Sequence, residues 1–516
     1  MRPGGGIIRN MDARRDVIEY GLRRWIIVLG VMLAPLMETI DSSIVNVALP
    51  TIQGNLGATL DEAAWVITGY LVANVIVIPL TPWLQTRFGR RQYFTATVIG
   101  FTTASVLCGM SGSIEALIGL RILQGLFGGG LIATAQATLR DTFTTAEVGL
   151  SQGIFAVIIL VGPIIAPMLG GYLVDAASWQ WIFFINVVPG IISATVVATM
   201  LRNPTEPAPA GVDVRGIVLL TLALGGLQFV LEEGERRDWF DSASIVVAAV
   251  IAAAGGIAFA FWELFGTRTP IVDLRILRYR TVSIGVVLAA GIAATLFGTT
   301  FVLPQFTQGV LGFTAFGSGE LLLFRALPIM LIAPLVAGLV GAGRVDVRIA
   351  MGTGYLLTAI GSFLIAGTTT SSTSFAEFLP GLVIGGLGTA MLFIPLLIAV
   401  QTATSADDAP KASSFITLAF QLGGSVASAM LVTLIDRRSD FHAQIIAGNL
   451  DLARPVVRSA LQAVTPAQLA GLATVQAQTL AFADVAYAAA AIAAILIPIV
   501  FLLQRSQHTI TEVTFE

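Results

Sequence analysis

The sequence predicts an all-α polytopic membrane protein with fourteen transmembrane helices. Two of the three observations behind this fold class are compositional: 56% of the 516 residues are hydrophobic and only 11% are charged, whereas about a quarter of a typical soluble domain is charged. The third is that the apolar residues form long runs, and about 20 such residues suffice to cross a bilayer. Core helices of a soluble protein would not recur this often with so little charge.

Fourteen segments have the length and apolar character of a membrane span. In chain order they are 25–48, 64–84, 93–113, 114–138, 150–174, 181–201, 214–232, 243–264, 282–304, 316–341, 348–368, 375–402, 413–436 and 481–503. The third and fourth segments are almost continuous across residues 111–114. No small-residue cleavage site follows the first segment, so we expect a retained anchor and not a signal peptide.

Basic residues in the connecting segments predict the orientation, because cytoplasmic loops carry an excess of arginine and lysine. If the N-terminus is cytoplasmic, inside segments carry 20 of the 28 basic residues and outside loops carry six. The remaining two, Arg121 and Arg325, lie inside predicted spans. We therefore expect both termini to be cytoplasmic, as an even number of spans requires.

The segments outside the spans divide the chain into regions. The expected regions are a cytoplasmic N-terminal segment at 1–24, a bundle at 25–201, a Pro-rich cytoplasmic linker at 202–213, a helix pair at 214–264, a cytoplasmic loop at 265–281, a second bundle at 282–503 and a cytoplasmic tail at 504–516. The second bundle includes a long extracytoplasmic loop at 437–480, whose stretches rich in alanine and glutamine are helix-prone. This loop is expected either to cap the helix ends or to dock an extracytoplasmic partner.

Composition also excludes several functional classes. The net charge of −3 and pI of about 5.6 leave no basic surface for a nucleic acid. Cys108 is the only cysteine, and His442 and His508 are the only histidines, so no metal site built on these residue types is expected. The only lysine, Lys411, lies in DDAPKAS without the Gly-rich turn of a phosphate-binding loop. Ion-gradient coupling is the remaining active mode, with no cofactor beyond the proton gradient.

A rival class is the proton-pumping subunit of a respiratory complex, which can also have about fourteen spans of this length. Such subunits use membrane-embedded lysines for proton transfer. Because Lys411 lies in a predicted cytoplasmic loop, the sequence argues against this class.

Ionisable residues inside the predicted spans are the candidates for proton coupling, because charge is costly in a bilayer. Glu38 and Asp41 are three residues apart in the first span and share a helix face. Asp41 and Arg121 are each about seven residues from the outer end of their spans, roughly 10 Å deep, so if the two helices are neighbours, either Asp41 or Glu38 can pair with Arg121. The pair is either a fixed ion pair or a carboxylate that titrates as access alternates. Arg325 and Glu320 in the tenth span are secondary candidates.

Glycine and proline mark the fifth span. Pro163 and Pro167 each remove a backbone donor and are expected to prevent a regular helix. Gly162, Gly170 and Gly171 permit close helix approach. Ordinary membrane-helix packing is the alternative interpretation, but two prolines four residues apart beside a double glycine are more specific than that.

With these motifs the chain resembles the major facilitator superfamily, in its fourteen-span drug/proton antiporter branch, and within it the EmrB-type multidrug efflux pumps. Besides the R-x-x-Q-G motif at Arg121, Gln124 and Gly125, the matching segments are DSSIVNVALPTI (41–52), WVITGYLVAN (65–74), GPIIAPMLGG (162–171), WQWIFFINV (179–187), RRDWF (236–240), FWELFGTRTPIVDL (261–274) and QLGGS (421–425). The similarity runs over nearly the whole chain.

The chain departs from the family pattern at three places. In the loop after the second span, Pro82 replaces a glycine and Thr86 an aspartate, so the charge relay of that loop is not expected to be complete. Ala166 replaces a glycine in the fifth span, and Phe420 an arginine before QLGGS. The loop after the second span otherwise matches a gating loop at Arg87, Gly89, Arg90 and Arg91.

The resemblance implies a major facilitator fold with two six-helix bundles, spans 1–6 and 9–14, and spans 7 and 8 inserted between them. Such bundles rock around a central site to give alternating access. Proton coupling would involve Asp41, Glu38 and Arg121. The residues expected to line the substrate cavity are Tyr70, Asn74, Gln124, Phe297, Phe301 and Gln421.

The implied function is transport and not enzymatic catalysis: proton-driven export of amphipathic or cationic drugs across a bacterial inner membrane. The EmrB-type resemblance also implies two partners, a periplasmic adaptor and an outer-membrane channel. Export of one physiological metabolite or siderophore on the same scaffold is the alternative.

Overall fold

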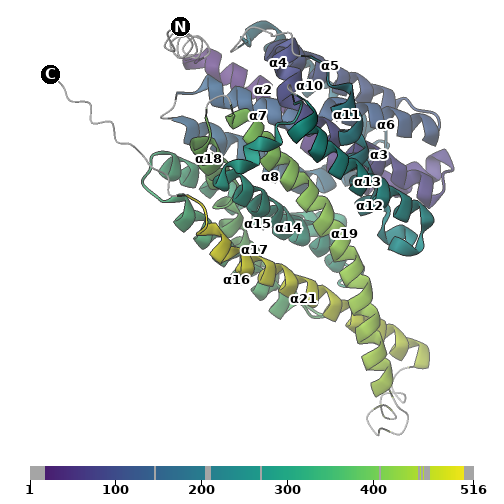
Figure 1. The fold of residues 1–516 in the computed structure, drawn as a ribbon. Coiled ribbons are helices and arrows are strands. Elements are labelled where there is room, and N and C mark those ends of the chain that lie inside the picture. Colours follow the sequence, from purple (N-terminus) through teal and green to yellow (C-terminus); the bar gives the residue numbers. More distant parts are fainter. Residues whose placement is uncertain are drawn as a thin grey trace, which may run out of the picture.

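The described part of this computed structural model comprises residues 18–144, 147–203, 211–267, 270–405, 408–450 and 465–504, with the isolated residues Arg454, Val457 and Ser459. Helices and connecting turns account for these ranges, and no strand occurs within them. The all-α prediction is therefore confirmed. The helix α2 begins, and α21 ends, at the same end of the molecule (Figure 1). We call it the inner end, because the sequence predicts it to be cytoplasmic, and the opposite end the outer end.

The first half of the chain forms six helical segments at the positions predicted for spans 1–6. They are α2 (Gly21–Leu56); α3 (Leu60–Val77), continued by η1 (Ile78–Leu80) and α4 (Thr81–Phe88); α5 (Arg90–Gly109); α6 (Ile114–Gly128), continued by α7 (Leu131–Thr142); α8 (Val148–Ala176); and α9 (Trp181–Phe184), continued by α10 (Val187–Met200). The third and fourth segments are separate because Ser113 caps α6, its side chain accepting a hydrogen bond from the amide of Ala116 at 3.3 Å.

Two inserted segments and six further segments complete the chain. The inserted pair consists of α11 (Val214–Leu220), η3 (Thr221–Gly225) and α12 (Gly226–Glu233), then α13 (Ala243–Phe261) and η6 (Trp262–Gly266), with the short η4 (Glu235–Arg237) and η5 (Trp239–Asp241) at its outer turn and η7 (Leu274–Arg278) after it. The second half consists of α14 (Arg280–Gly309), α15 (Ala315–Gly341), α16 (Val347–Thr368), α17 (Phe375–Ala390) with α18 (Phe393–Ala403), α19 (Ala409–Asn449) and α21 (Pro466–Val500).

Twelve helical segments among the described residues are long and apolar enough to cross a membrane. The other two predicted spans coincide with α5 and α8. The 20 residues of α5 begin with two arginines, and α8 contains two shorter apolar stretches, Leu150–Ile159 and Ile165–Ala176. The order of six, two and six segments agrees with the expected architecture.

The helix α8 runs without a break through both of its prolines. The expectation that Pro163 and Pro167 prevent a regular helix is therefore wrong. Prolines are tolerated inside membrane helices because neighbouring helices and local adjustments satisfy the freed backbone groups.

The two halves are packed together most completely at the inner end. One hydrophobic cluster there contains Leu139 and Phe155 from the first half and Val336 and Leu396 from the second. Towards the outer end, Ile44 and its neighbours form a cluster of the first half alone, and the buried members of another cluster all come from the second half. Val157 and Ile165 of α8 pack against this second-half cluster, so the two halves also touch there, and the larger shared cluster lies at the inner end.

The predicted extracytoplasmic loop at 437–480 is largely helical. The 41 residues of α19 correspond to about 60 Å of helix, twice the roughly 30 Å of a bilayer core. The described parts of the loop continue α19 to Asn449 and begin α21 at Pro466, and Figure 1 shows both helices projecting past the outer end of the body. This projecting hairpin, residues 437–450 and 465–480, does not fold back over the other helices as a cap would.

An ion-pair cluster joins the two arms where the projecting hairpin begins. On α21, Asp484 accepts hydrogen bonds from Arg438 at 2.6 Å and from His442 at 2.7 Å, both on α19. Most of residues 451–464 lie outside the described part of the chain, as do residues 1–17 of the N-terminal segment, 204–210 of the linker and 505–516 of the tail.

The only lysine of the chain lies at the start of α19 and contacts the segment that follows the inserted pair. Lys411 Nζ is 3.2 Å from Asp273 and 3.1 Å from Asp408. Burial opposes ionisation of Asp408, but hydrogen bonds from Lys411 and Tyr279 and the lysine charge hold the pKa of its carboxyl below its ordinary value. Lys411 therefore ties the loop after the inserted pair to the second half.

Candidate functional site

A buried ion pair joins α2 and α6 in the first half. Arg121 Nη1 lies 2.5 Å from Asp41 Oδ2, and the two side chains are 1% and 0% exposed. The sequence predicted that Asp41 or Glu38 pairs with Arg121, and the structure places Asp41 at ion-pair distance. A carboxylate and a guanidinium buried together must satisfy most of their hydrogen bonds, because isolated buried charges cost several kcal/mol or more.

Amide side chains satisfy the remaining oxygen of Asp41. Gln124 Nε2 and Asn186 Nδ2 each donate to Asp41 Oδ1 at 2.9 Å. Arg121 in turn donates to Gln124 Oε1 at 2.7 Å and to the backbone oxygen of Val66 at 3.1 Å. Four segments (α2, α3, α6 and the turn before α10) thus meet at one charge pair.

The second acid of α2, Glu38, has a different environment. It is 5% exposed and accepts one hydrogen bond, from Asn74 Nδ2 at 3.1 Å. No basic side chain within the described ranges lies at ion-pair distance from it. The Tyr70 ring covers the other side of the site, 4.1 Å from the guanidinium carbon of Arg121.

Close helix contacts make this arrangement possible. A Cβ atom on Gly125 would lie 2.3 Å from the backbone oxygen of Tyr70, and one on Gly129 would lie 2.3 Å from that of Asn74. Only glycine therefore lets α6 approach α3 closely enough for Arg121 to reach Val66.

The predicted antiporter motif on α8 packs against the helix that carries both acids. A Cβ atom on Gly162 would lie 2.3 Å from Thr39 Oγ1, and one on Gly170 would lie 2.7 Å from Ile44 Cγ1. These two contacts lie on either side of Asp41 along α2. Gly171 differs, since a Cβ atom there would meet no atom closer than 4.0 Å.

The predicted gating loop connects α4 to α5. Gly89 directly precedes α5 and has φ 83°, in the left-handed region that favours glycine. Arg90 forms an ion pair with Asp141 on α7 at 2.6 Å and donates to Gln85 at 3.2 Å. Arg91 lies beside Arg90, its backbone amide bonded to Asn203 at 2.8 Å. Arg87 lies near the rings of Trp83 and Phe88. Thr86 bonds only its own helix, to Pro82 O at 2.9 Å.

The second half holds a buried arginine in a different environment. Arg325 on α15 is 2% exposed, and its Nη2 donates to Thr295 O at 3.4 Å and to Thr389 Oγ1 at 3.3 Å. No carboxylate among the described residues lies at ion-pair distance, and its Nε has no hydrogen-bond partner there. The other secondary candidate, Glu320, is exposed on the same helix.

The residues predicted to line one cavity lie in two places. Tyr70, Asn74 and Gln124 belong to the Asp41 site. Phe297 lies in the second half, where Phe420 packs against it at 6.2 Å and against Phe393 at 5.0 Å between ring centroids. Gln421 follows Phe420 on α19, and the side chain of Phe301 lies outside the described residues.

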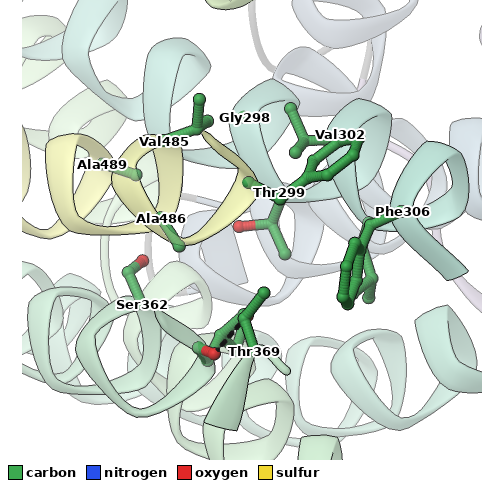
Figure 2. A pocket seen from close by; sticks show the side chains of 12 residues that line it. Gly298, Thr299, Val302, Phe306, Ser362, Thr369, Val485, Ala486 and Ala489 are labelled. Atoms are coloured by element: carbon green, nitrogen blue, oxygen red, sulfur yellow. Dashed lines mark hydrogen bonds between the residues drawn. The ribbon is translucent and has the colours of Figure 1, made fainter. Parts of the chain in front are cut away.

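A small cavity opens elsewhere in the second half, between α14, α16 and α21. Figure 2 shows Thr299, Val302 and Phe306 on α14 facing Ser362 and Thr369 of the α16 end and Val485 on α21. Its volume of about 30 Å³ holds one or two water molecules. It is too small for a drug-sized compound in this conformation.

Sequence reasoning missed Asn186, which donates to Asp41, and Ser105, which accepts from Asn186 at 3.0 Å. The available signal was an asparagine inside the apolar segment WQWIFFINV. Among the residues that the structure describes, no three His, Cys, Asp or Glu side chains gather as a metal site would require.

The fold and this buried charge cluster define a polytopic transport protein. A family model described as Major Facilitator Superfamily matches residues 31–428, and the chain belongs to this family of transporters. It is 33% identical to the multidrug export protein EmrB of Escherichia coli strain K12 over 429 residues, 82% of this chain and 83% of that one. It is 32% identical to the probable multidrug resistance protein EmrY of the same strain, over 85% of both chains.

A third relative has a different name. The chain is 32% identical to the fatty acid resistance protein FarB of Neisseria gonorrhoeae, over 81% of this chain and 82% of that one. Two solved structures share the fold: the human organic anion transporter MFSD10, with a TM-score of 0.57 at 15% identity, covering 94% of this chain and all of that one, and an inward-facing bacterial homologue of the lysosomal transporter Spinster, with a TM-score of 0.55 at 17% identity, covering 94% and 98%.

The environment of Arg325 generates a stability prediction. A buried charge without an ionic partner keeps its desolvation cost, whereas removing one partner of a buried ion pair costs about 3–5 kcal/mol. Arg325→Met is therefore expected to raise the melting temperature of the detergent-purified protein, whereas Arg121→Met, which leaves Asp41 buried without its cation, is expected to lower it. A fall of the melting temperature in both variants would contradict this difference between the two arginines.

Proposed function

We propose that this chain exports amphipathic or cationic drugs in exchange for protons. The observation that carries the proposal is the buried ion pair between Asp41 and Arg121 inside the membrane, whose charged atoms lie 2.5 Å apart. Charges at this depth are costly and tend to serve transport. The 33% identity to a multidrug export protein supports drugs as the substrate class.

In the coupling step, a proton and a cationic substrate would compete for the negative charge of Asp41. Protonation from the outer side removes the negative charge that holds Arg121, which keeps its bonds to Gln124 and Val66. The weakened pair frees α2 and α6 to shift, and a cationic substrate loses its counter-charge and is released. Release of the proton to the inner side restores the pair. Glu38, one turn earlier on α2, is the second acid of the same site.

The substrate would lie between the two halves, against aromatic rings of the second half. Phe420 is half-buried and packs with Phe297 and Phe393. Because Phe420 stands where family members carry an arginine, this surface has one positive charge fewer, which favours cationic compounds. An apolar surface with few fixed polar groups fits broad specificity.

The first test replaces the proton-binding group. With one proton exchanged per substrate, a pH difference of one unit supports about a tenfold substrate gradient. Proteoliposomes containing the wild type are expected to build this gradient of a fluorescent cationic dye, and Asp41→Asn to build none. Asp175→Asn, which changes an exposed acid at the end of α8, is the matched control and should behave as wild type. Unchanged proton dependence in Asp41→Asn would exclude this role.

The antiporter motif provides a second test, on proton leak. Gly170→Val introduces a side chain against Ile44 and should loosen the contact between α8 and α2, so that protons leak without substrate. Gly171→Val, at the neighbouring position with open space, is the matched control. We expect a faster collapse of an imposed pH gradient in Gly170→Val proteoliposomes only. Equal leak in both variants would identify the motif as ordinary packing.

We further propose that the protein works in a bacterial inner membrane, with both termini cytoplasmic, and binds a periplasmic adaptor that leads to an outer-membrane channel. The projecting hairpin supports this proposal. From residue 437 to Asn449, α19 continues for about 20 Å. Phe441, Ile445 and Leu472 on this hairpin are exposed by 47%, 47% and 59%. Exposed apolar groups beyond a span favour a protein contact.

The adaptor proposal is tested by co-purification. The triple variant Phe441→Ser, Ile445→Ser, Leu472→Ser should lose a co-expressed adaptor while it still exports dye in proteoliposomes. Thr474→Ala, which removes an exposed hydroxyl that bonds only Ala470 O on its own helix, should retain the adaptor. Retention by the triple variant would locate docking elsewhere.

A single physiological substrate is the alternative, and the similarity to FarB favours a fatty acid. The two candidates differ in the range of compounds that a deletion strain no longer tolerates. Sensitivity to many unrelated toxic compounds supports the multidrug function, whereas sensitivity to fatty acids alone supports the alternative.

A further inference from the structure

Three sequence motifs, one of which also contributes to the Asp41 site, meet along α12. They are WVITGYLVAN at 65–74 on α3, RRDWF at 236–240 after α12, and QLGGS at 421–425 on α19. These segments belong to the first half, the inserted pair and the second half. The inserted pair therefore contacts both halves and connects them.

On the side of the first half, α12 contacts the turn of α3 next to the coupling site. Thr68 Oγ1 donates to Glu233 Oε1 at 3.0 Å, and the rings of Trp65 and Phe229 are stacked with centroids 5.5 Å apart. Glu233 is fully buried and is also bonded by Arg236 at 3.3 Å and Arg237 at 3.1 Å. This contact is both polar and aromatic.

On the side of the second half, α12 contacts α19 at two levels. Gln228 Nε2 donates to Ser425 Oγ at 2.8 Å and to Glu232 at 2.9 Å. Further out, Thr433 donates to Glu235, and Trp239 Nε1 donates to Glu235 at 2.6 Å and to Thr433 at 3.1 Å. Asp238 and Trp239 adopt left-handed conformations, with φ of 54° and 50°, which fold this turn back towards α19.

The coupling site is bonded to the same turn of α3. Arg121 Nε donates to the backbone oxygen of Val66 at 3.1 Å, and Val66 lies between Trp65 and Thr68 in the sequence. An unbroken series of contacts therefore runs from Asp41 through Arg121, α3 and α12 to Ser425. A displacement of Arg121 acts on the backbone that positions Trp65 and Thr68.

We propose that α12 transmits the protonation of Asp41 to the second half, with Thr68, Glu233, Gln228 and Ser425 as its positioning residues. This inference rests on the proposed proton coupling. The charged or titratable groups that face the series are Glu38, Tyr70 and Cys108 near Asp41, Glu232, Glu235, Arg236 and Arg237 around α12, and Asp436 of α19 beside Glu235. If these contacts were purely structural, they would stabilise the protein without affecting the proton dependence of export.

The first experiment is a double-mutant cycle on proton-driven dye export. Thr68→Val and Ser425→Ala each remove one hydroxyl, and each should lower the coupled rate about two- to tenfold. If the contacts act in series, the double variant is no slower than the slower single variant, whereas independent contacts multiply their effects. Thr221→Val on the inserted pair, whose hydroxyl bonds only Ile217 O, should match wild type. Multiplied effects, or wild-type rates in both single variants, overturn the proposal.

The second experiment does not depend on transport. Trp239 donates to both Glu235 and Thr433, so its fluorescence reports the contact between α12 and α19. The component that Trp239→Phe removes is expected to change with pH in the wild type, and to lose that change in Asp41→Asn and in Thr68→Val. A pH response that persists in both variants overturns the relay. If the wild type shows the response but exports no dye, the relay stands and the proposed function fails.

Discussion

The Asp41–Arg121 ion pair imposes the tightest constraint on the first half of the molecule, because neither charge reaches solvent. In a membrane interior, two such charges are tolerated only with near-complete hydrogen bonding. Gln124, Asn186 and the carbonyl of Val66 supply it. Each donor or acceptor comes from a different place in the chain, so the helices that carry them must pack closely. The glycines of α6 and α8 allow that packing, which makes the motif residues around the pair parts of one arrangement.

The two halves each consist of six helical segments, but their buried arginines have different partners. The first half pairs its arginine with a carboxylate, whereas Arg325 in the second half bonds, within the described part of the chain, a carbonyl and a hydroxyl. Aromatic rings take the place of charge near Phe420. The inserted pair lies between these environments and bonds both, through Glu233 on one side and Gln228 on the other. An exchange of protons for substrates is consistent with this division, since the charge chemistry and the apolar surface lie in separate halves.

Much of the fold is predictable from apolar runs, because their length and order along the chain can be found in the sequence alone. The fourteen segments and the even span count come from these runs. The pairing of Arg121 with Asp41 or Glu38 was predictable because depth in a membrane can be counted in residues. Asn186 was not, because an asparagine inside an apolar run does not reveal which helix it faces. Tyr70, Asn74 and Gln124 were assigned to a substrate cavity but surround the charge pair, since sequence spacing carries no information on which neighbouring helix covers a face. The alanine- and glutamine-rich stretches of 437–480 predict helices outside the membrane, but their composition does not reveal that these helices continue α19 and α21 as a projecting hairpin.

The central claim is that Asp41 exchanges a proton for substrate, and proton release on substrate binding measures it most directly. When purified wild-type protein in weakly buffered detergent solution is mixed with a saturating cationic dye, the solution should become more acidic in proportion to the amount of protein. The Asp41→Asn variant should cause no acidification, whether or not it binds the dye. Proton release of the same size from wild type and Asp41→Asn would contradict the account, and so would dye binding by the wild type that releases no proton at any pH at which the protein is folded.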